Sequence, residues 1–192
     1  MFTLMRNIHL GLGLACVLMA LVFAVSSLVI IYRPWLETAP VKSETVVQLS
    51  QDAAASPRAA ARELMARHGL AGDLAQIEEE GDSVSFRIGR PGEAADVTYT
   101  PASGEARVVV TRQGALETLV HLHTNHGFWH EYAPANLWAI IAFLASAGLL
   151  LLGATGIYLW FAHHSERLIG GILLGSGIIF GLTTLVLTRL QQ

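Results

Sequence analysis

The chain has 192 residues, of which 53% are hydrophobic and only 14% are charged, a composition unlike that of an ordinary soluble domain. All but three of the 12 Lys and Arg and all but one of the 15 Asp and Glu lie between Arg33 and Glu131, so a polar middle is flanked by apolar ends. This arrangement excludes a soluble enzyme, a disordered tail and a nucleic-acid binder. The single cysteine, Cys16, lies in the first apolar end, which excludes an intrachain disulfide and a Cys-based zinc site.

Three uncharged or nearly uncharged segments, residues 8–31, 136–162 and 168–188, are each long enough to cross the bilayer as a helix. The first is longer than the apolar part of a secretory signal, and no small-x-small cleavage site precedes Tyr32, so it is interpreted as an uncleaved anchor. Three spans predict a multi-pass protein whose termini lie on opposite sides of the membrane.

The orientation predicted from basic residues is an amino terminus on the cytoplasmic side, with the polar middle outside, but the margin is a single charge. Aromatic residues that mark the two interfaces are Tyr32, Trp35, Trp129, Tyr132 and Trp138 on one side, and Tyr158 and Trp160 on the other. The third span carries two small-xxx-small steps, Gly171 with Gly175 and Gly177 with Gly181. These favour either packing within a three-helix bundle or a dimer face, and the sequence leaves both open.

The middle, residues 53–113, is predicted to be a helix followed by an antiparallel sheet. Ser56 is suited to cap a helix with Pro57 at its first position, and Gly69 ends it. The pattern then changes to a period of two, which predicts four short strands separated by turns. Residues 38–52, before the helix, show no sustained periodicity and are predicted to be a linker.

Short motifs at the membrane edges, in this order, resemble those of the PepSY-associated transmembrane family. They are Arg6 to Leu12, in which a His is followed by Gly-Leu, then Leu122-His123-Thr124, and finally Thr155 to Trp160, which reads TGIYLW. The resemblance implies an α+β membrane protein of the inner (cytoplasmic) membrane, with three transmembrane helices and a small extracytoplasmic PepSY-like helix-plus-antiparallel-sheet domain, periplasmic or extracellular. Larger members have four or more spans, so this chain is similar to a half-length member.

Seven of the eight histidines lie at the predicted membrane edges, where an ionisable side chain is a functional candidate. Residues 116–132 are predicted as a His-rich interfacial helix, on which His126 and His130 would share one face. With His121 they form a candidate metal site, better suited to Cu²⁺ or Zn²⁺ than to Mg²⁺ because imidazole is the main donor. The alternative is that such imidazoles serve as amphipathic anchors in the headgroup region.

A b-type haem is the second cofactor hypothesis, with His9, His123 and His126 as candidate ligands. The two axial ligands approach the iron from opposite faces, which one helix face cannot provide. A homodimer, or a larger membrane complex, would supply the second imidazole from another chain. The resemblance implies, through longer family members, haem-containing reductases of ferric siderophores, so the chain would at most be a haem-dependent reductase component that transfers electrons.

An accessory or regulatory subunit is the competing hypothesis. PepSY domains resemble peptidase propeptide inhibitors, and the acidic run Glu78 to Asp82 could face a protein partner, although such a run is more often a solvated strand end. An autonomous hydrolase is not expected, because the sequence has no HExxH, no GxSxG and no phosphate-binding glycine loop.

Overall fold

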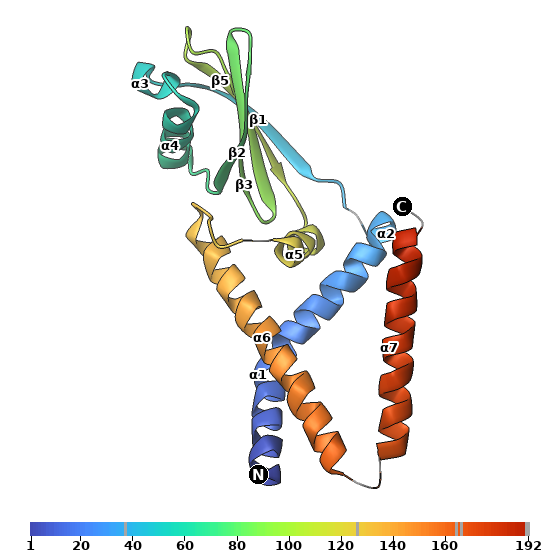
Figure 1. Ribbon diagram of the computed structural model, residues 1–192. Helices are drawn as coiled ribbons and strands as arrows, with labels where there is room; N and C mark the ends of the chain where they lie inside the picture. The colour runs from blue at the N-terminus through green and yellow to red at the C-terminus, as the bar shows by residue number, and fades with distance from the viewer. Residues whose placement is uncertain (37, 126, 164, 166, 191–192) are drawn as a thin grey trace. The chain divides into compact units, whose positions relative to one another are not determined.

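The computed structural model describes residues 1–36, 38–125, 127–163, 165 and 167–190. It contains three long apolar helices and, between the first two, a five-stranded antiparallel sheet with short helices (Figure 1). The predicted α+β membrane fold class is therefore confirmed. The chain divides into two compact units, Met1–Leu18 with Leu144–Gln192 and Met19–Phe143, and each is described by itself.

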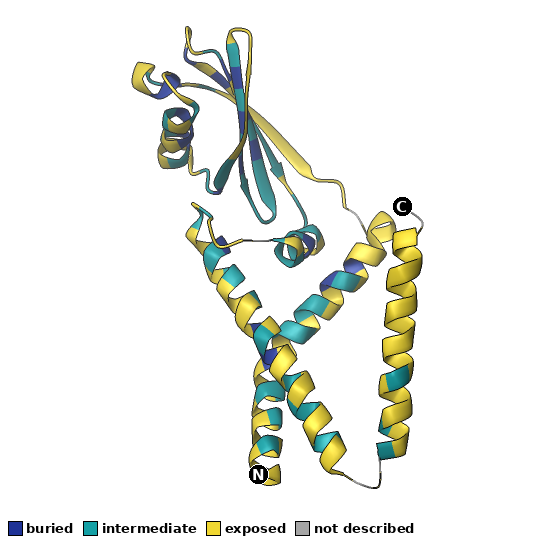
Figure 2. Ribbon diagram, in the orientation of Figure 1, coloured by how far each residue is buried: buried dark blue, intermediate teal, exposed yellow. Residues whose placement is uncertain are grey.

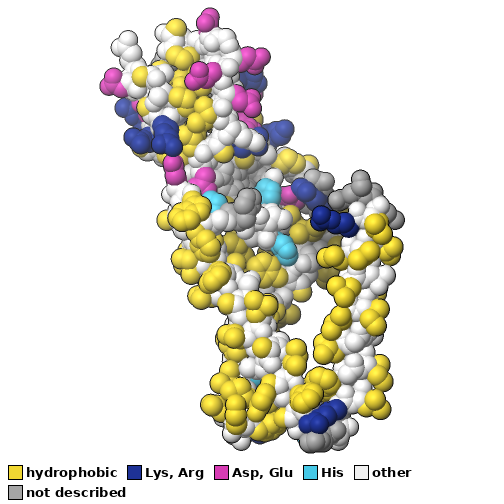
Figure 3. Space-filling view, in the orientation of Figure 1, with side chains coloured by type: hydrophobic (Ala, Val, Ile, Leu, Met, Phe, Trp, Pro, Cys, Tyr) yellow, Lys and Arg dark blue, Asp and Glu magenta, His cyan; other side chains and the backbone are white. Residues whose placement is uncertain are grey.

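The long helices are α1, α6 and α7, and each is long and apolar enough to cross a membrane: Phe2–Ile31, Ala133–Ala162 and Arg167–Leu190. Their large apolar side chains are mostly exposed (Figures 2 and 3), as expected for helices whose solvent is lipid. None of the residues of α7 is buried. The charged side chains instead gather over the sheet and its helices, and at the ends of α7 (Figure 3).

Small residues bring α1 and α6 together in the first unit. A Cβ built on Gly148 would lie 2.5 Å from the Cys16 sulfur, and one built on Gly13 would lie 3.6 Å from the Leu152 side chain. Because residue numbers rise along α1 as they fall along α6, the two helices cross in opposite directions. The missing side chains permit this close approach, which is how helices commonly pack in lipid.

The sheet of the second unit has the strand order β1-β5-β4-β3-β2, and every pair is antiparallel. The strands are β1 Val41–Gln48, β2 Asp73–Glu80, β3 Ser83–Arg90, β4 Glu93–Tyr99 and β5 Glu105–Arg112. The short helices are α2 Arg33–Leu36, α3 Gln51–Ala54, α4 Pro57–His68 and α5 Ala115–Thr124. The strand order places β1, first in sequence, beside β5, the last.

One face of the sheet and the helices α3 and α4 make the core of the polar domain. Leu64 of α4 is completely buried, and along β3 every second residue is buried from Val84 to Ile88. Phe86 and Tyr99 meet edge to face in the same core, with ring centroids 6.0 Å apart. The buried residues seen on α4 and on the central strands in Figure 2 are this single cluster.

The helix predicted from its caps is α4. The Ser56 hydroxyl accepts a hydrogen bond from the Ala59 N–H, Pro57 occupies the first turn, and Gly69 ends the helix in the left-handed conformation. The linker prediction for residues 38–52 is wrong, because β1 and α3 lie there. Strand β1 is an edge strand with nearly all its side chains exposed, so it shows no apolar alternation. Its pairing comes from the backbone of β5, which no local pattern reveals.

The predicted helix over residues 116–132 is too long. Helix α5 ends at Thr124, Asn125 is extended, and Gly127 has a φ of +91°. The segment after Gly127 is held by the rest of the unit instead, since the Asn136 side chain bonds both the N–H and the C=O of His130. The helical face expected to join His126 and His130 does not form, and His126 itself lies outside the described residues.

Two glycines that flank β2, Gly72 and Gly81, test the backbone packing at the two ends of this strand. Gly72 has a φ of +153°, and a Cβ there would lie 2.4 Å from the Gly89 carbonyl oxygen, whereas Gly81 has a φ of +60° and open space around it. We expect Gly81→Ala to cost about 1 kcal/mol, the strain of a left-handed residue, and Gly72→Ala to cost clearly more, because backbone must move. Thermal unfolding of the full chain in detergent measures both, and equal losses would contradict this packing.

Candidate functional site

The first candidate site centres on His9, in the first unit. Its Nδ1 lies 3.0 Å from the Thr155 hydroxyl on α6. Beside it, a Cβ built on Gly156 would come within 3.2 Å of the His9 ring, so glycine leaves the space that the ring occupies. Thr155 and Gly156, the first two residues of the TGIYLW segment, thus form the surface that the His9 ring contacts.

The proton of the Thr155 hydroxyl decides which imidazole nitrogen carries hydrogen. This hydroxyl lies 2.8 Å from the Leu151 carbonyl and 3.0 Å from the Leu152 carbonyl, to which it donates its one proton. Its oxygen must therefore accept from the His9 Nδ1–H. In the neutral imidazole the Nε2 atom then keeps a lone pair, and no described residue forms a hydrogen bond with it.

The second candidate site repeats this arrangement in the second unit. His123 of α5 places its Nδ1 2.6 Å from the hydroxyl of Ser26, a fully buried residue of α1. The Ser26 hydroxyl donates to the Phe23 carbonyl at 3.0 Å, so its oxygen accepts from the imidazole. The Phe23 ring meets the imidazole edge to face, with centroids 5.0 Å apart. In its neutral form His123 therefore also presents an Nε2 lone pair without a partner among the described residues.

Helix α5 is fixed against the membrane helices of its unit by an indole. Trp138 of α6 donates its Nε1–H to the Leu122 carbonyl at 2.8 Å, and its ring lies 6.4 Å from that of Phe23. Val120, on the same helix, is buried. The orientation of His123 is thus set by the contacts of its own ring and by those of the preceding turn of α5.

The remaining candidate histidines are engaged with carboxylates. The His130 Nδ1 lies 2.5 Å from Asp73 of β2, whose other oxygen accepts from the Tyr132 N–H at 2.7 Å. His121 lies 3.6 Å from Glu117, one turn earlier on α5. Within the described parts of the chain no three His, Cys, Asp or Glu side chains are placed to hold a metal ion. The metal set of His121, His126 and His130 stays a prediction, since His126 is not described.

A charged cluster occupies the end of the sheet where β3 turns into β4. Glu93 accepts from Arg90 at 3.0 Å and from Arg112 at 2.8 Å. The hydrogen bond from Arg112, helped by the charge of Arg90, lowers the pKa of the Glu93 carboxyl. A hydrogen bond with the Tyr132 side chain and the charge of Glu93 raise the pKa of Arg90. The cluster is therefore fully ionised and carries one more positive than negative charge.

Sequence reasoning found the two histidines but not the residues that orient them. Ser26 and Thr155 are hydroxyls inside apolar spans, and that is the one signal the sequence offered. Which imidazole each one meets depends on contacts across 97 and 146 residues. The Asp73 partner of His130 was missed for the same reason.

These features define a multi-pass membrane protein with one polar domain and two imidazoles held by hydroxyl groups of α1 and α6. The chain belongs to the family described as PepSY-associated TM region, which matches residues 6–184. The predicted family is therefore confirmed over nearly the whole chain. No curated protein and no solved structure matches it.

The Thr155 contact can be tested by removing its hydroxyl. We expect Thr155→Val to destabilise the protein by about 1–3 kcal/mol, because the His9 N–H loses its acceptor where no water replaces it, and Thr155→Ser to restore most of the loss. The matched control is Thr184→Val on α7, whose hydroxyl donates to the Phe180 carbonyl. Thermal unfolding in one detergent gives the comparison, and equal effects of the two valines would count against the contact.

The Glu93 cluster predicts a pH dependence. The folded-state pKa of Glu93 lies below its ordinary value of 4.5, so its ion pairs contribute stability above pH 4.5, and this contribution is lost as the pH falls through the folded pKa. We expect Glu93→Gln to be less stable than the wild type at neutral pH, with the difference shrinking on acidification below pH 4.5. Glu78→Gln, at an exposed position of β2, is the control. A difference that does not change with pH would refute this role.

Proposed function

We propose that this protein is a b-haem-binding electron-transfer component of the cytoplasmic membrane, acting as a homodimer or within a larger membrane complex. His9 and His123 each offer one imidazole nitrogen to iron. The observation that carries the proposal is the shared geometry of the two residues. In each, a hydroxyl with its own proton committed to a helix carbonyl accepts from Nδ1 and leaves the Nε2 lone pair unused.

The donor set fits a haem iron. Haem proteins of this kind take imidazole nitrogens as axial ligands. A ligating histidine generally donates its other ring N–H to a nearby acceptor, which fixes the tautomer and the ring orientation. Histidines that served only as interfacial anchors would have no need of the buried acceptor that Ser26 provides to His123.

A second copy of the chain completes each site in this proposal. In a two-fold dimer, His9 and the same residue of a second copy would hold one haem, and His123 and the same residue of that copy would hold another. The glycine-rich α7, with no buried residue, leaves membrane surface available for such an association. His126 stays a further candidate ligand.

The positions of the two sites suit transfer across the membrane. His9 lies in the first third of α1, and Ser26, the partner of His123, lies near the end of the same helix. Bound haem would accept and release single electrons at these positions. In this proposal Thr155 and Ser26 hold the two imidazole rings through Nδ1, so that Nε2 of each faces the haem. In the proposed orientation the amino terminus is cytoplasmic and the polar domain is extracytoplasmic.

A second candidate function is a subunit whose domain binds a protein partner. Strand β1 is an edge of the sheet, and it exposes the apolar side chains of Val41 and Val46. An edge of this kind can accept a strand from another chain. Haem content distinguishes the two proposals, because this second function requires none.

The test is a reduced-minus-oxidised visible spectrum of the purified full-length protein, expressed with haem precursor available. We expect the sharp α-band of bis-histidine b haem, at about one haem per chain if two haems are shared by a dimer. His9→Ala and His123→Ala should each remove roughly half of the band, because each destroys one class of site.

The control is His68→Ala, at the end of α4 in the polar domain. It should leave the band intact. A flat spectrum, or a band that neither membrane histidine affects, would refute the haem proposal and favour the partner-binding function.

A further inference from the structure

A pocket of about 570 Å³ lies at the end of the sheet that carries the β2–β3 and β4–β5 turns, and helices α3 and α4 border it through Ala54 and Pro57. The chain enters the sheet at Val41 and leaves it at Arg112, two residues that are paired at the opposite end of the strands. The pocket is therefore separated from both connections to the long helices by roughly 25 Å, the length of one strand. Its volume falls within the range of ligand sites.

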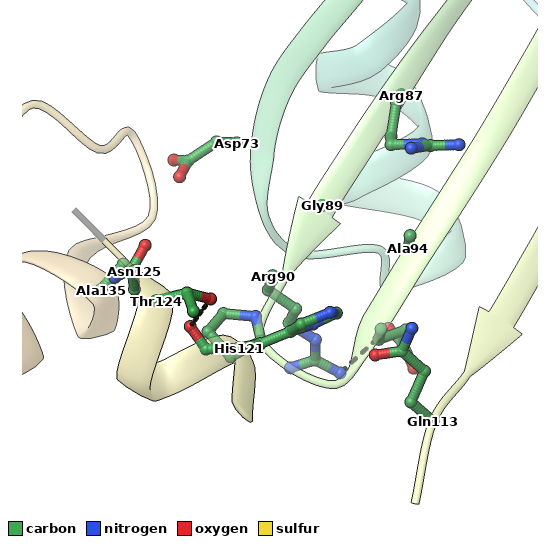
Figure 4. A pocket seen from close by; sticks show the side chains of 12 residues that line it. Asp73, Arg87, Gly89, Arg90, Ala94, Gln113, His121, Thr124, Asn125 and Ala135 are labelled. Atoms are coloured by element: carbon green, nitrogen blue, oxygen red, sulfur yellow. Dashed lines mark hydrogen bonds and ion pairs between the residues drawn. The ribbon is translucent and has the colours of Figure 1, made fainter. Parts of the chain in front are cut away.

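The acidic charge beside this pocket has no partner. The five residues from Glu78 to Asp82 include four carboxylates, and no ion pair joins any of them to a described residue. The pocket at the other end of the sheet, beside α5, differs in this respect (Figure 4), because its Glu93 is paired with Arg90. The uncompensated charge at the β2–β3 turn favours a cation over an anion.

The register of the sheet directs one of these carboxylates toward the pocket. Glu79 pairs with Val84, and Val84 pairs with Tyr99, so the three residues share one face of the sheet. This is the core face, since Val84 and Tyr99 are both buried. Glu78, one residue earlier, faces the other side. Glu79 lines the pocket together with Asp82 of the turn.

The inner wall of the pocket contains the phenol of Tyr99, which is only 2% exposed. Its hydroxyl forms no hydrogen bond with any described residue. The described side-chain polar atoms that are both inaccessible and unpaired belong to Gln113 and Asn125, so the Tyr99 hydroxyl stays open to the pocket. Burial, and then the charge of Glu79, raise the pKa of Tyr99. The pocket thus offers a protonated hydroxyl whose oxygen is free to accept a hydrogen bond.

The remaining chemistry of the pocket narrows the class of cation. Part of its wall is apolar, formed by Ala54, Pro57, Val84 and Pro101. No three His, Cys, Asp or Glu side chains of the described residues converge as they would around a metal ion. An arginine side chain fits better, because its aliphatic stem packs on apolar walls and its planar guanidinium carries five N–H donors for several acceptors. The lysine ammonium is a compact and more strongly hydrated charge.

We propose that this pocket receives the guanidinium of an arginine side chain from a protein partner. Glu79 and Asp82 hold its positive charge, and the Tyr99 oxygen accepts one of its N–H groups. The inference rests on the partner-binding function, the second candidate above, and requires no haem. The two can fail separately, since a haem band in the visible spectrum counts against the partner-binding function, whereas a peptide titration reports on the pocket alone.

The probe is a blocked pentapeptide with arginine at the centre of four alanines, titrated into the full-length protein in a nonionic detergent. Matched peptides carry citrulline, the neutral isostere of arginine, or lysine. The chain has four tyrosines, so ¹³C-labelled tyrosine rings give few NMR signals, and Tyr99→Phe identifies the signal of Tyr99. We expect the arginine peptide to shift this signal and to bind at least about tenfold more tightly than either matched peptide.

Variants assign the contacts. Glu79→Gln and Asp82→Asn should each weaken the arginine peptide by about five- to tenfold. Tyr99→Phe should weaken it severalfold without lowering the melting temperature, because the hydroxyl has no partner among the described residues. The matched control is Glu78→Gln, which removes the same charge from the other face of the sheet and should change the affinity less than about twofold.

Equal affinity for the arginine peptide and either matched peptide, or no shift of the Tyr99 signal, would overturn the proposal. An effect of Glu78→Gln as large as that of Glu79→Gln would also overturn it, since it would show only a general attraction between a basic peptide and an acidic surface. Thermal unfolding of each variant confirms that the chain is folded. The comparison of the three peptides on the wild type depends on no variant.

Discussion

The absence of water within the bilayer is the constraint on which the membrane part of this protein depends, because every polar group there must find its partner in the protein. Six hydroxyls of the long helices meet it locally, each donating to a carbonyl of its own helix three or four residues earlier: Ser26, Ser27, Thr155, Ser176, Thr184 and Thr188. Each donation leaves the oxygen free to accept. Ser26 and Thr155 use this second capacity to bind an imidazole from another helix. The tautomer of each histidine therefore follows from an ordinary feature of serine and threonine in membrane helices.

The polar domain is stabilised differently, because its charged surface is suited to water and its core lies between one face of the sheet and the helices α3 and α4. Its connection to α6 includes several directional contacts. Asp73 holds the segment before α6 through the His130 ring and the Tyr132 N–H, and Trp138 holds α5 through the Leu122 carbonyl. Helix α5 thus presents His123 to α1, while His121 lines a pocket together with Arg90 and Gln113.

The parts of the fold that were predictable are those with a local physical signal. Long apolar runs indicated the spans, Ser56 and Gly69 marked α4, and alternation marked the four strands β2 to β5. The sequence of β1 shows no alternation of apolar and polar residues because nearly all its side chains are exposed. Its pairing depends on the backbone of β5. The helix predicted over residues 116–132 was too long because Asn125 is extended, Gly127 has a positive φ, and Asn136 and Asp73 bind the segment that follows. In the candidate site, the histidines were visible as ionisable residues at membrane edges, but their hydroxyl partners were not, since helix packing alone brings them together.

A histidine that binds a cofactor and a histidine that only anchors the chain in the headgroup region differ in what their two ring nitrogens contact. An anchor at the headgroup level is free to direct both nitrogens toward water, and burial of a specific acceptor beside it serves no purpose. Ser26 is fully buried, its proton is committed to the Phe23 carbonyl, and the ring it holds is flanked by the Phe23 side chain. His130 shows the contrasting case in the same unit, since its Nδ1 meets a carboxylate that also holds the backbone at Tyr132. In this unit His130 holds the segment before α6, whereas the Nδ1 of His123 contacts a buried hydroxyl of α1. The difference between the two histidines follows from the group that each Nδ1 contacts.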